Sequence, residues 1–261
     1  MHPRTAVIVQ ARFGSTRLPG KVLEDLAGHS VLEHVLHRCR AIADADVVCC
    51  AIPAAGDSDA VAQAAERAGA LVYRGDEHDV LDRYYRAAQK VDAAVVMRVT
   101  SDCPLIDPAI CAAVLRLRAH HGADYAGNNM PRSGPHGLDC EAFTFAALQR
   151  AAREATDAYS REHVTPWLRS HPQLIRCNLA VGTEGGELRW TLDYPEDLAF
   201  LRALFVLLPP WPAIPPTRDV LRVLTGHPEI AAINRHLAQL SPQRSAAAAQ
   251  SGEPHGNIER T

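Results

Sequence analysis

Apolar runs alternate with segments of helical period through the first half of the chain. Short runs rich in Val, Ile and Ala predict strands at about 5–11, 46–52, 70–73 and 93–99. The segments between and after them carry apolar residues at helical spacing and predict helices at about 30–42, 57–69, 78–90 and 108–121. Strict alternation of this kind is typical of α/β proteins, so we expect a mainly parallel (mixed) sheet flanked by helices.

The pattern changes after about residue 121. A polar loop rich in Gly, Asn and Pro spans 127–137, and a loop of that length in a compact domain is commonly functional. Beyond it the pattern predicts, in order, a strand at 138–143, a helical region to about 170, strands near 174–181 and 187–193, a helix from Pro195, a proline-rich connection at 208–216 and two short helices. We therefore expect one domain over 1–240, with halves of about 1–121 and 122–240, and a disordered tail at 241–261.

Composition excludes several classes of protein. The chain has 261 residues, enough for one large domain with a full core. Its 27 Lys and Arg against 30 Asp and Glu, a formal net charge of -3, argue against a protein that coats nucleic acid. Seven cysteines without a C-x-x-C pair are typical of reduced thiols, and no apolar stretch is long enough to span a bilayer. We expect a cytoplasmic protein with no nucleic-acid and no membrane partner.

A basic loop punctuated by glycines follows the first predicted strand, at 10–21. From residue 1 to 22 the chain has four fixed cations and no carboxylate, although the whole chain is slightly acidic. Glycine lets amide N–H groups converge on an anion, arginine offers a planar fork, and hydroxyls add donors. The sequence matches neither a Walker A loop nor G-x-G-x-x-G, and a solvated basic turn is the alternative. The residues expected to contact phosphate are Arg12, Gly14, Ser15, Thr16, Arg17 and Lys21.

Two aspartates are expected at the same sheet edge as this loop. Asp102 follows the predicted strand 93–99, and Asp193 ends the predicted strand 187–193. In open α/β sheets the carboxyl ends of the strands face the ligand crevice. Because Mg²⁺ is commonly held by one or two carboxylates and substrate phosphates, the pair predicts a magnesium site. Asp102 could instead form a turn, and Glu196 and Asp197 need no role beyond stabilising a helix start, an explanation that does not extend to Asp193.

Other candidate chemistry is sparse. The histidines lack the spacing of a zinc site, and no G-x-S-x-G elbow supports a serine hydrolase. His163 lies among charged residues, where either substrate contact or ordinary helix pairing would explain it.

With these residues in view, the chain resembles the CMP-sugar synthetases, the cytidylyltransferase family that activates 3-deoxy-manno-octulosonate and acylneuraminate. It is most similar to the SpsF-like branch of spore coat polysaccharide biosynthesis proteins. The resemblance covers about 4–238 and rests on six motifs in order: 10–23, 79–84, 98–108, 137–141, 161–165 and 189–198.

The resemblance implies a nucleotide-diphospho-sugar transferase fold of the GT-A-like type, CTP, Mg²⁺ and a homodimer. It places Arg12, Ser15, Arg17 and Lys21 on the triphosphate loop and Asp102 and Asp193 on the metal positions, and among these we expect Lys21, Arg12 and Asp102 to be catalytic. The implied reaction transfers CMP from CTP to an acidic or phosphorylated sugar, releasing pyrophosphate, for surface polysaccharide or glycan biosynthesis. The nucleotide then belongs to the first half of the domain, and the sugar and dimer contacts to the second. The residues expected to bind the sugar are Asp139, Glu141, Arg161 and His163.

Two other functions remain open from the sequence. A glycosyltransferase of the same fold would hold a nucleotide sugar through an Asp-x-Asp motif, but Ser101-Asp102-Cys103 has one aspartate and a triphosphate loop is not needed there. A non-catalytic nucleotide-binding subunit is the third possibility. The presence of Asp102, Asp193 and Lys21 together argues against it.

Overall fold

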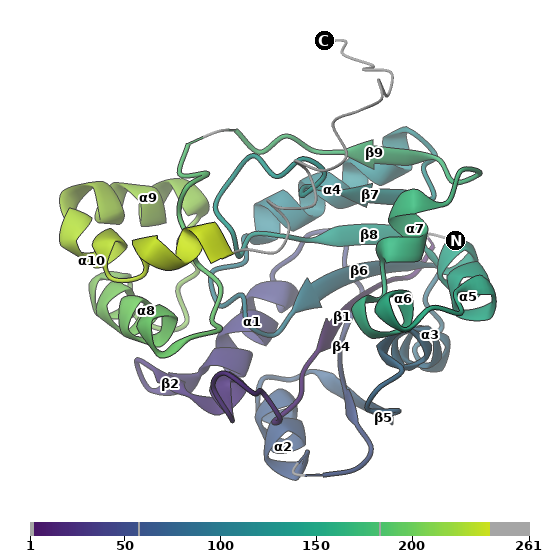
Figure 1. The fold of residues 1–261 in the computed structure, drawn as a ribbon, viewed down its shortest axis with the longest axis horizontal. Coiled ribbons are helices and arrows are strands. Elements are labelled where there is room, and N and C mark those ends of the chain that lie inside the picture. The colour runs from purple at the N-terminus through teal and green to yellow at the C-terminus, as the bar shows by residue number, and fades with distance from the viewer. Residues whose placement is uncertain (1–2, 57, 183, 241–261) are drawn as a thin grey trace.

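A computed structural model describes residues 3–56, 58–182 and 184–240 of the chain. The first half confirms the predicted alternation (Figure 1). Its strands are β1 (Thr5–Gln10), β4 (Val47–Pro53), β5 (Leu71–Gly75) and β6 (Val95–Thr100). Its helices are α1 (Val31–Arg40), α2 (Asp59–Arg67), α3 (Val80–Lys90) and α4 (Pro108–His120).

The main sheet has the order β5-β4-β1-β6-β8-β7-β9 within the described residues. The three further strands are β7 (Tyr125–Gly127), β8 (Glu141–Thr144) and β9 (Arg176–Asn178). Strands β5, β4, β1 and β6 are parallel to one another, whereas β8 is antiparallel to both β6 and β7. The expected mixed, mainly parallel sheet is therefore confirmed. Because the chain leaves β1 toward β4 on one side and later returns to β6 on the other, the carboxyl ends of β1 and β6 lie at a topological switch point, where ligand crevices form.

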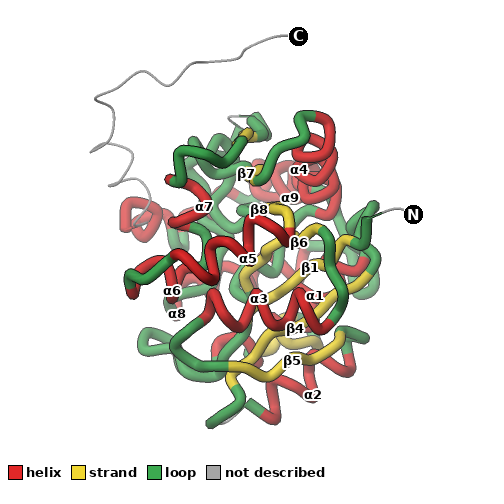
Figure 2. Tube along the Cα trace, turned by 90° about the vertical axis from the view of Figure 1, so that its right-hand side faces the viewer, coloured by secondary structure: helices red, strands yellow, loops and turns green. Residues whose placement is uncertain are grey.

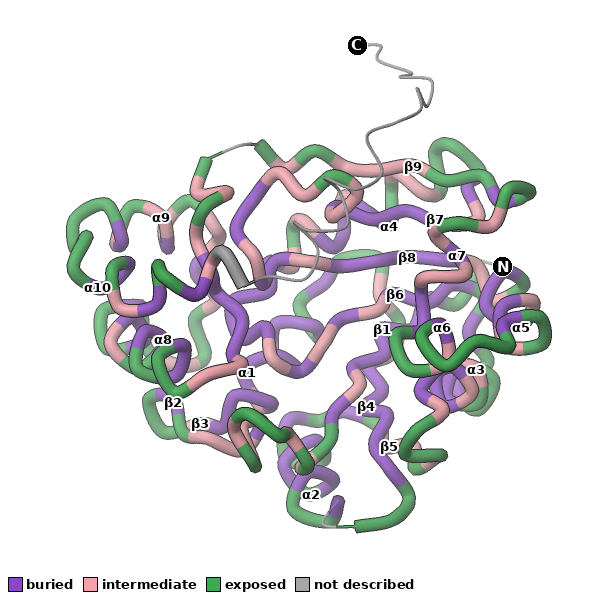
Figure 3. Tube along the Cα trace, viewed as in Figure 1, coloured by how far each residue is buried: buried purple, intermediate pink, exposed green. Residues whose placement is uncertain are grey.

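Helices cover both faces of the sheet. Val7 and Val9 of β1 pack with residues of α1, α2 and α4, while Ala6 and Ile8 face α3 and α5 (Phe145–Glu154). All four are fully buried, which explains why β1 is a continuous apolar run rather than an alternating one. Figure 2 shows α3 and α5 across the near face of the strands, and Figure 3 shows the central strands almost entirely buried.

The last part of the chain forms a third apolar cluster beside the sheet. It is built from α8 (Pro195–Leu207), α9 (Thr217–Gly226) and α10 (Pro228–Ala232), which gather at the left of Figure 1. Their side chains pack around the buried Trp190 and reach Leu26 in a small hairpin of β2 (Asp25–Leu26) and β3 (His29–Ser30). The remaining elements are α6 (Ala158–His163), α7 (Pro166–Ser170), and the 3-10 helices η1 (Lys21–Leu23) and η2 (Arg235–Leu240).

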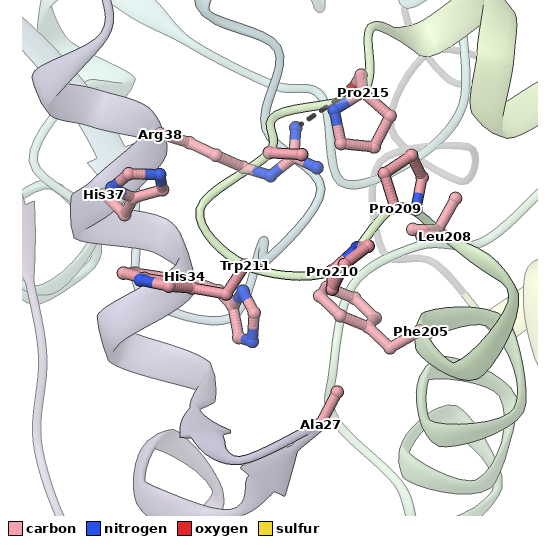
Figure 4. Close-up of a pocket in the computed structure, with 11 residues that line it drawn as sticks. Ala27, His34, His37, Arg38, Phe205, Leu208, Pro209, Pro210, Trp211 and Pro215 are labelled. Atoms are coloured by element: carbon pink, nitrogen blue, oxygen red, sulfur yellow. Dashed lines mark hydrogen bonds between the residues drawn. The ribbon is translucent and has the colours of Figure 1, made fainter.

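A ring cluster joins this layer to the first half of the chain. The Trp211 ring stacks on the His29 ring at 4.0 Å between centroids and lies 4.1 Å from that of His37. His34 is buried beneath it, with its Nε2 2.8 Å from the Leu26 carbonyl oxygen. The cluster borders a cavity of about 30 Å³, shown in Figure 4. The proline-rich connection is thus irregular, as expected, and it is also packed against α1.

Two expectations for the second half were wrong in whole or in part, and one strand was missed. The segment 187–193 is not a strand but an irregular connection with one isolated bridge, between His136 and Arg189. Only 176–178 of the expected strand 174–181 is a strand, and β7 was not expected at all. The predicted tail, 241–261, lies outside the described residues. Within the part that the structure describes, no helix is long and apolar enough to cross a membrane.

Candidate active site

The basic loop closes on itself between β1 and η1. The Gly20 N–H donates to the Phe13 carbonyl at 3.0 Å, and the Lys21 N–H donates to the Leu18 carbonyl at 3.2 Å. Gly20 has a φ of +72°, and a Cβ at that position would lie 3.2 Å from the Phe13 ring. Glycine is favoured there because other residues resist both the dihedral and the close contact. The turn brings the Lys21 side chain to the carboxyl edge of the sheet.

Lys21 joins the two predicted aspartates. Its ammonium donates to Asp102 Oδ2 at 3.2 Å, to Asp193 Oδ1 at 2.9 Å and to the Leu192 carbonyl at 2.6 Å. Its side chain is only 13% exposed. The fold therefore assembles Lys21, Asp102 and Asp193, called the lysine cluster below, from three distant parts of the chain.

The Asp102 loop follows β6 directly. The backbone carbonyl of Asp102 accepts a hydrogen bond from the Leu192 N–H at 2.8 Å, which ties this loop to the one that carries Asp193. The Cys103 thiol donates to Asp102 Oδ1 at 3.5 Å, and Thr100 Oγ1 lies 3.3 Å from the same sulfur. Both carboxylate oxygens of Asp102 are thus held by neighbours, one by Lys21 and one by the thiol.

Asp193 is held by two arginines in addition to Lys21. Arg189 Nη2 donates to its Oδ2 at 2.8 Å, and Arg17 Nη2 donates to its Oδ1 at 2.9 Å. The fully buried Asp197 in the first turn of α8 accepts from Arg189 Nε at 2.9 Å and from the Asp193 N–H at 2.9 Å. Asp197 therefore does more than stabilise a helix start, because it also fixes the loop that presents Asp193.

The charges in the lysine cluster support one another. Burial acts to raise the pKa of Asp102, but the charge of Lys21 and hydrogen bonds from Thr100 and Lys21 outweigh it, so that pKa lies well below its usual range. Burial acts to lower the pKa of Lys21, but Asp102 and Asp193 outweigh it and raise that pKa. The ammonium and the Asp102 carboxylate are both charged near neutral pH.

The cluster lies in a cleft of about 220 Å³. All of the residues expected to contact phosphate line it, and so do three other expected site residues: Asp102, Asp193 and His163. The other lining residues are Gln10, Ala11, Val22, Val80, Arg83, Thr100, Ser101 and Glu162. The cleft thus has a basic rim along 12–21 and carboxylates beside it, at the switch point of the sheet.

The residues present fit a cation that shares its coordination with a substrate. The described residues contain no group of three or more His, Cys, Asp and Glu that could hold a metal by themselves. Asp102 and Asp193, however, lie close enough to bond one ammonium, and a pair of carboxylates completed by phosphate oxygens is a common way to hold Mg²⁺.

The two residues expected on α6 differ in their placement. His163 lines the cleft, and its ring lies 4.4 Å from that of the exposed Tyr159. Burial lowers the pKa of His163, which favours the neutral ring. Arg161 does not line the cleft; it forms an ion pair with Asp79, the N-cap of α3, and donates to the Ala152 carbonyl at 2.7 Å.

Asp139 and Glu141 also lie outside the cleft lining. Asp139 accepts from Arg132 Nε at 2.8 Å and lies 3.9 Å from His136 Nε2. Glu141 is 1% exposed, and it accepts from Arg98 Nη1 at 2.6 Å, from Arg169 Nη2 at 2.5 Å and from the Tyr125 hydroxyl at 2.6 Å.

Both carboxylate oxygens of Glu141 are therefore engaged inside the protein, and the structure brings it to a buried ion network rather than to the cleft. Burial acts to raise the pKa of Glu141, but Arg169 and Arg98 outweigh it and lower it to about 2.

Three charged residues near the cleft were not expected as site residues. Arg83 is 2% exposed, lines the cleft and donates to the Glu77 carbonyl at 3.2 Å, and Glu162 lines the cleft as well. Arg189 supports Asp193 from behind. All three lie in motifs that carry the family resemblance, at 79–84, 161–165 and 189–198, so a signal was present. Helical periodicity alone could not separate Arg83 from the other polar positions of its helix.

Comparison with known proteins gives a consistent result. The sequence profile of the cytidylyltransferase family matches residues 6–202. Spore coat polysaccharide biosynthesis protein SpsF of Bacillus subtilis (strain 168) is 32% identical over 206 residues, which are 76% of this chain and 85% of that protein.

Solved structures are similar as well. A cytidylyltransferase from Leptospira borgpetersenii serovar Hardjo-bovis (strain JB197) superposes with a TM-score of 0.83 at 26% identity, over 88% of this chain and 97% of its own. CMP:2-keto-3-deoxy-manno-octonic acid synthetase, in a complex with CTP, superposes with a TM-score of 0.59 at 20% identity, over 78% of this chain and 99% of its own. These likenesses confirm the nucleotide-diphospho-sugar transferase fold.

Proposed function

Because this chain belongs to the cytidylyltransferase family, we propose that it transfers CMP from CTP to an acidic or phosphorylated sugar and releases pyrophosphate. The product would be a nucleotide sugar for the synthesis of a surface polysaccharide or glycan. The synthetase with a similar fold that binds CTP, and the polysaccharide biosynthesis protein with a similar sequence, support this choice of substrates.

The observation that carries the proposal is the lysine cluster at the base of the basic loop. Lys21 contacts both aspartates, and Arg17 contacts Asp193 as well, so cations and carboxylates meet within one cleft. A triphosphate needs cations along its length, and a metal bridging its phosphates needs carboxylates beside it. The cleft supplies both at the carboxyl ends of β1 and β6.

The reaction is a direct displacement. A sugar oxygen bonds to the α-phosphorus of CTP, the bond from that phosphorus to the β-phosphate oxygen breaks, and the hydroxyl proton leaves to a base or to water. Arg12, Arg17 and Lys21 bind the β- and γ-phosphates and stabilise the negative charge that grows on the leaving pyrophosphate. No covalent intermediate with the protein is needed.

We propose Mg²⁺ as the cofactor, held by Asp102 and Asp193 together with phosphate oxygens of CTP. When bound, it would neutralise charge on the reacting and leaving phosphoryl oxygens. The protein itself must keep the two carboxylates close together. In the structure Lys21, Arg17 and Arg189 form the ion pairs that position Asp193 for this.

Among the residues expected to bind the acceptor sugar, His163 lines the cleft, whereas Arg161 and Asp139 do not. We propose that the sugar enters on the side of α6, where neutral His163 can accept a hydrogen bond from a sugar hydroxyl. We also propose the homodimer that the family resemblance implies.

The proposal is tested by measuring pyrophosphate release with each of the four nucleoside triphosphates and a panel of acidic sugars and sugar phosphates. We expect release with CTP, Mg²⁺ and at least one acceptor. Lys21→Ala should lower kcat by roughly 100-fold or more, since an interaction that strengthens in the transition state is lost. Lys90→Ala, at the exposed end of α3, is the matched control and should retain full activity.

Two results would contradict the proposal in different ways. Release of a sugar from a nucleotide sugar, with no pyrophosphate release from CTP, would identify a glycosyltransferase. CTP binding without turnover on the whole panel would support a non-catalytic subunit.

A further inference from the structure

We propose that Lys21 and a divalent cation compete for the same two carboxylates, so that Lys21 makes metal binding depend on the arrival of the nucleotide triphosphate. The inference rests on the proposed function for the identity of the nucleotide. It adds a second role for Lys21: besides contacting phosphate, the lysine prevents Asp102 and Asp193 from binding a metal ion alone.

The hydrogen bonds of Lys21 show why it competes. An ammonium has three N–H donors, and Lys21 directs them to Asp102 Oδ2, Asp193 Oδ1 and the Leu192 carbonyl, at 3.2, 2.9 and 2.6 Å. Every donor is therefore used inside the protein. Lys21 can bind a phosphate oxygen only if it releases one of these three acceptors, and two of them belong to the carboxylates on which a metal site depends.

Position and charge make simultaneous occupancy unfavourable. A magnesium ion bound to these carboxylates would lie about 2.0–2.1 Å from their oxygens, and the ammonium nitrogen is already within hydrogen-bond distance of one oxygen of each. The two cations would thus be near neighbours in a cleft where the Lys21 and Asp193 side chains are 13% and 15% exposed. Water screens little of the repulsion between like charges at such a buried site.

The surrounding charges strengthen the effect. Asp193 already contacts Lys21, Arg17 and Arg189, so its negative charge is offset by the protein before any metal arrives. Displacing Lys21 without giving it new acceptors would leave a nearly buried ammonium with one carbonyl partner, which is costly. A triphosphate removes this cost because its oxygens accept the hydrogen bonds that Lys21 gives up.

Metal and nucleotide should therefore bind cooperatively, and the coupling should be reciprocal, as linkage requires. Without nucleotide, Lys21 keeps the carboxylates and the metal binds weakly. With nucleotide, Lys21 moves to the phosphates and the carboxylates become available. Removing the ammonium should raise the affinity for the metal alone and reduce the gain in metal affinity on adding nucleotide.

The first test uses Mn²⁺ as the probe, with free Mn²⁺ measured by electron paramagnetic resonance in the absence of nucleotide. The wild-type chain is compared with Lys21→Met, which keeps much of the side-chain volume without the charge. We expect Lys21→Met to bind Mn²⁺ roughly 10-fold more tightly or better. Lys90→Met should match the wild type, and Lys21→Met combined with Asp193→Asn should lose the gain.

Equal Mn²⁺ affinities for the wild type and Lys21→Met would overturn the proposal. The result is independent of the proposed function, since it uses neither CTP nor a sugar. If the wild type releases pyrophosphate but binds Mn²⁺ no more weakly than Lys21→Met does, the proposed function stands and this role of Lys21 is wrong. A chain without turnover could still show the affinity gain.

The second test needs no variant of the site. The chain has only two lysines, Lys21 and Lys90, so a protein labelled with ¹³C at lysine Cε should give two lysine signals, which Lys90→Met assigns. We expect Mg²⁺ alone to leave the Lys21 signal in place, and Mg²⁺ with a non-hydrolysable CTP analogue to shift it. A shift of the same size with Mg²⁺ alone, or none when the analogue is bound, would contradict the exchange of partners.

Discussion

At the scale of single residues, Asp102 and Asp193 behave as one unit because they share Lys21. Asp102 is additionally held by Cys103, and Asp193 by Arg17 and Arg189. Neutralising either carboxylate changes the hydrogen bonds that Lys21 donates. Because Lys21 also donates to the other carboxylate, the environment of that carboxylate changes as well. Their contributions to catalysis should therefore not be independent.

A double-mutant cycle tests this dependence. Asp102→Asn and Asp193→Asn should each lower kcat by roughly 100-fold or more, because each removes a carboxylate from the proposed metal and phosphate site. The double variant should lose far less than the product of the two single effects, as residues acting together do. Turnover with Mg²⁺ and CTP is the measurement.

Asp219→Asn, at an exposed surface pair with Arg222, is the control and should leave kcat unchanged. Multiplicative losses in the double variant, or turnover that survives EDTA, would contradict a shared metal site.

At the scale of elements, the Glu141 network fastens β6, β8 and α7 together. Arg98 lies on β6, Glu141 on β8 and Arg169 on α7, and the Glu141 side chain between the two guanidinium groups is almost fully buried. Arg98 Nη2 also donates to Gln10 Oε1 at 3.3 Å, and Gln10 lines the cleft. The network thus supports the floor of the site from behind.

Glu141→Gln should destabilise the fold rather than alter substrate binding. Neutralising this carboxylate leaves two arginines without their buried counter-charge, and breaking such a pair typically costs about 3–5 kcal/mol. Urea unfolding would measure the loss. Glu154→Gln, which removes an exposed pair with Arg150 on α5, should cost less than about 1 kcal/mol. A Glu141→Gln variant of normal stability whose KM for the sugar alone is raised would instead restore the expected role in substrate binding.

The elements also show what the sequence could predict. Strands β1, β4 and β6 were predicted because runs buried on both faces are apolar without interruption. The segment 187–193 was wrongly predicted as a strand because Trp190 and Leu192 alternate with polar residues. In the structure both side chains are fully buried. Alternation of apolar and polar residues indicates which side chains are buried, but a strand also needs regular backbone hydrogen bonds to a neighbouring strand. Here the N–H groups of Trp190 and Leu192 donate instead to the carbonyls of His136 and Asp102.

The site was predictable where its residues follow strands. Asp102 comes after β6 and the basic loop after β1, so topology alone placed them on one edge. Glu141 was expected to bind the sugar, but its arginine partners lie 43 and 28 positions away in the chain. Nothing in the pattern near a residue reveals a charge pair across such a separation, so the sequence could not distinguish a buried network residue from a substrate ligand.

At the scale of the whole molecule, the ring cluster at Trp211 joins the C-terminal layer to α1. His34 is the buried member, and its neutral ring donates from Nε2 to the Leu26 carbonyl. Burial lowers its pKa from 6.5 to about 4, and the charges of Arg38, His29 and His37 act in the same direction. The packing is therefore compatible with a neutral ring and not with a protonated one.

This makes the stability of the molecule depend on pH. Below about pH 6.5 the unfolded chain protonates His34 and the folded chain does not until about pH 4, so the free energy of unfolding falls as the pH falls through this window. From pH 7 to 5 the loss due to His34 should be about 2 kcal/mol. His34→Gln should be less stable than the wild type at pH 7, and the difference should narrow at pH 5.

Urea unfolding at the two pH values measures the difference, with the exposed His120→Gln as the control. Parallel curves for the wild type and His34→Gln would show that protonation of this ring is not coupled to folding.

The three members of the lysine cluster are translated at widely separated times. Asp102 lies 81 positions after Lys21, and Asp193 lies 172 positions after it. The strands β1, β4, β5 and β6 are complete once residue 100 has been made, so the parallel part of the sheet can form while the rest is still being synthesised. Contacts that close such long loops are the late ones in folding. A nascent or prematurely terminated chain can therefore build half of the sheet without assembling the cluster, and only the finished domain is competent to consume nucleotide.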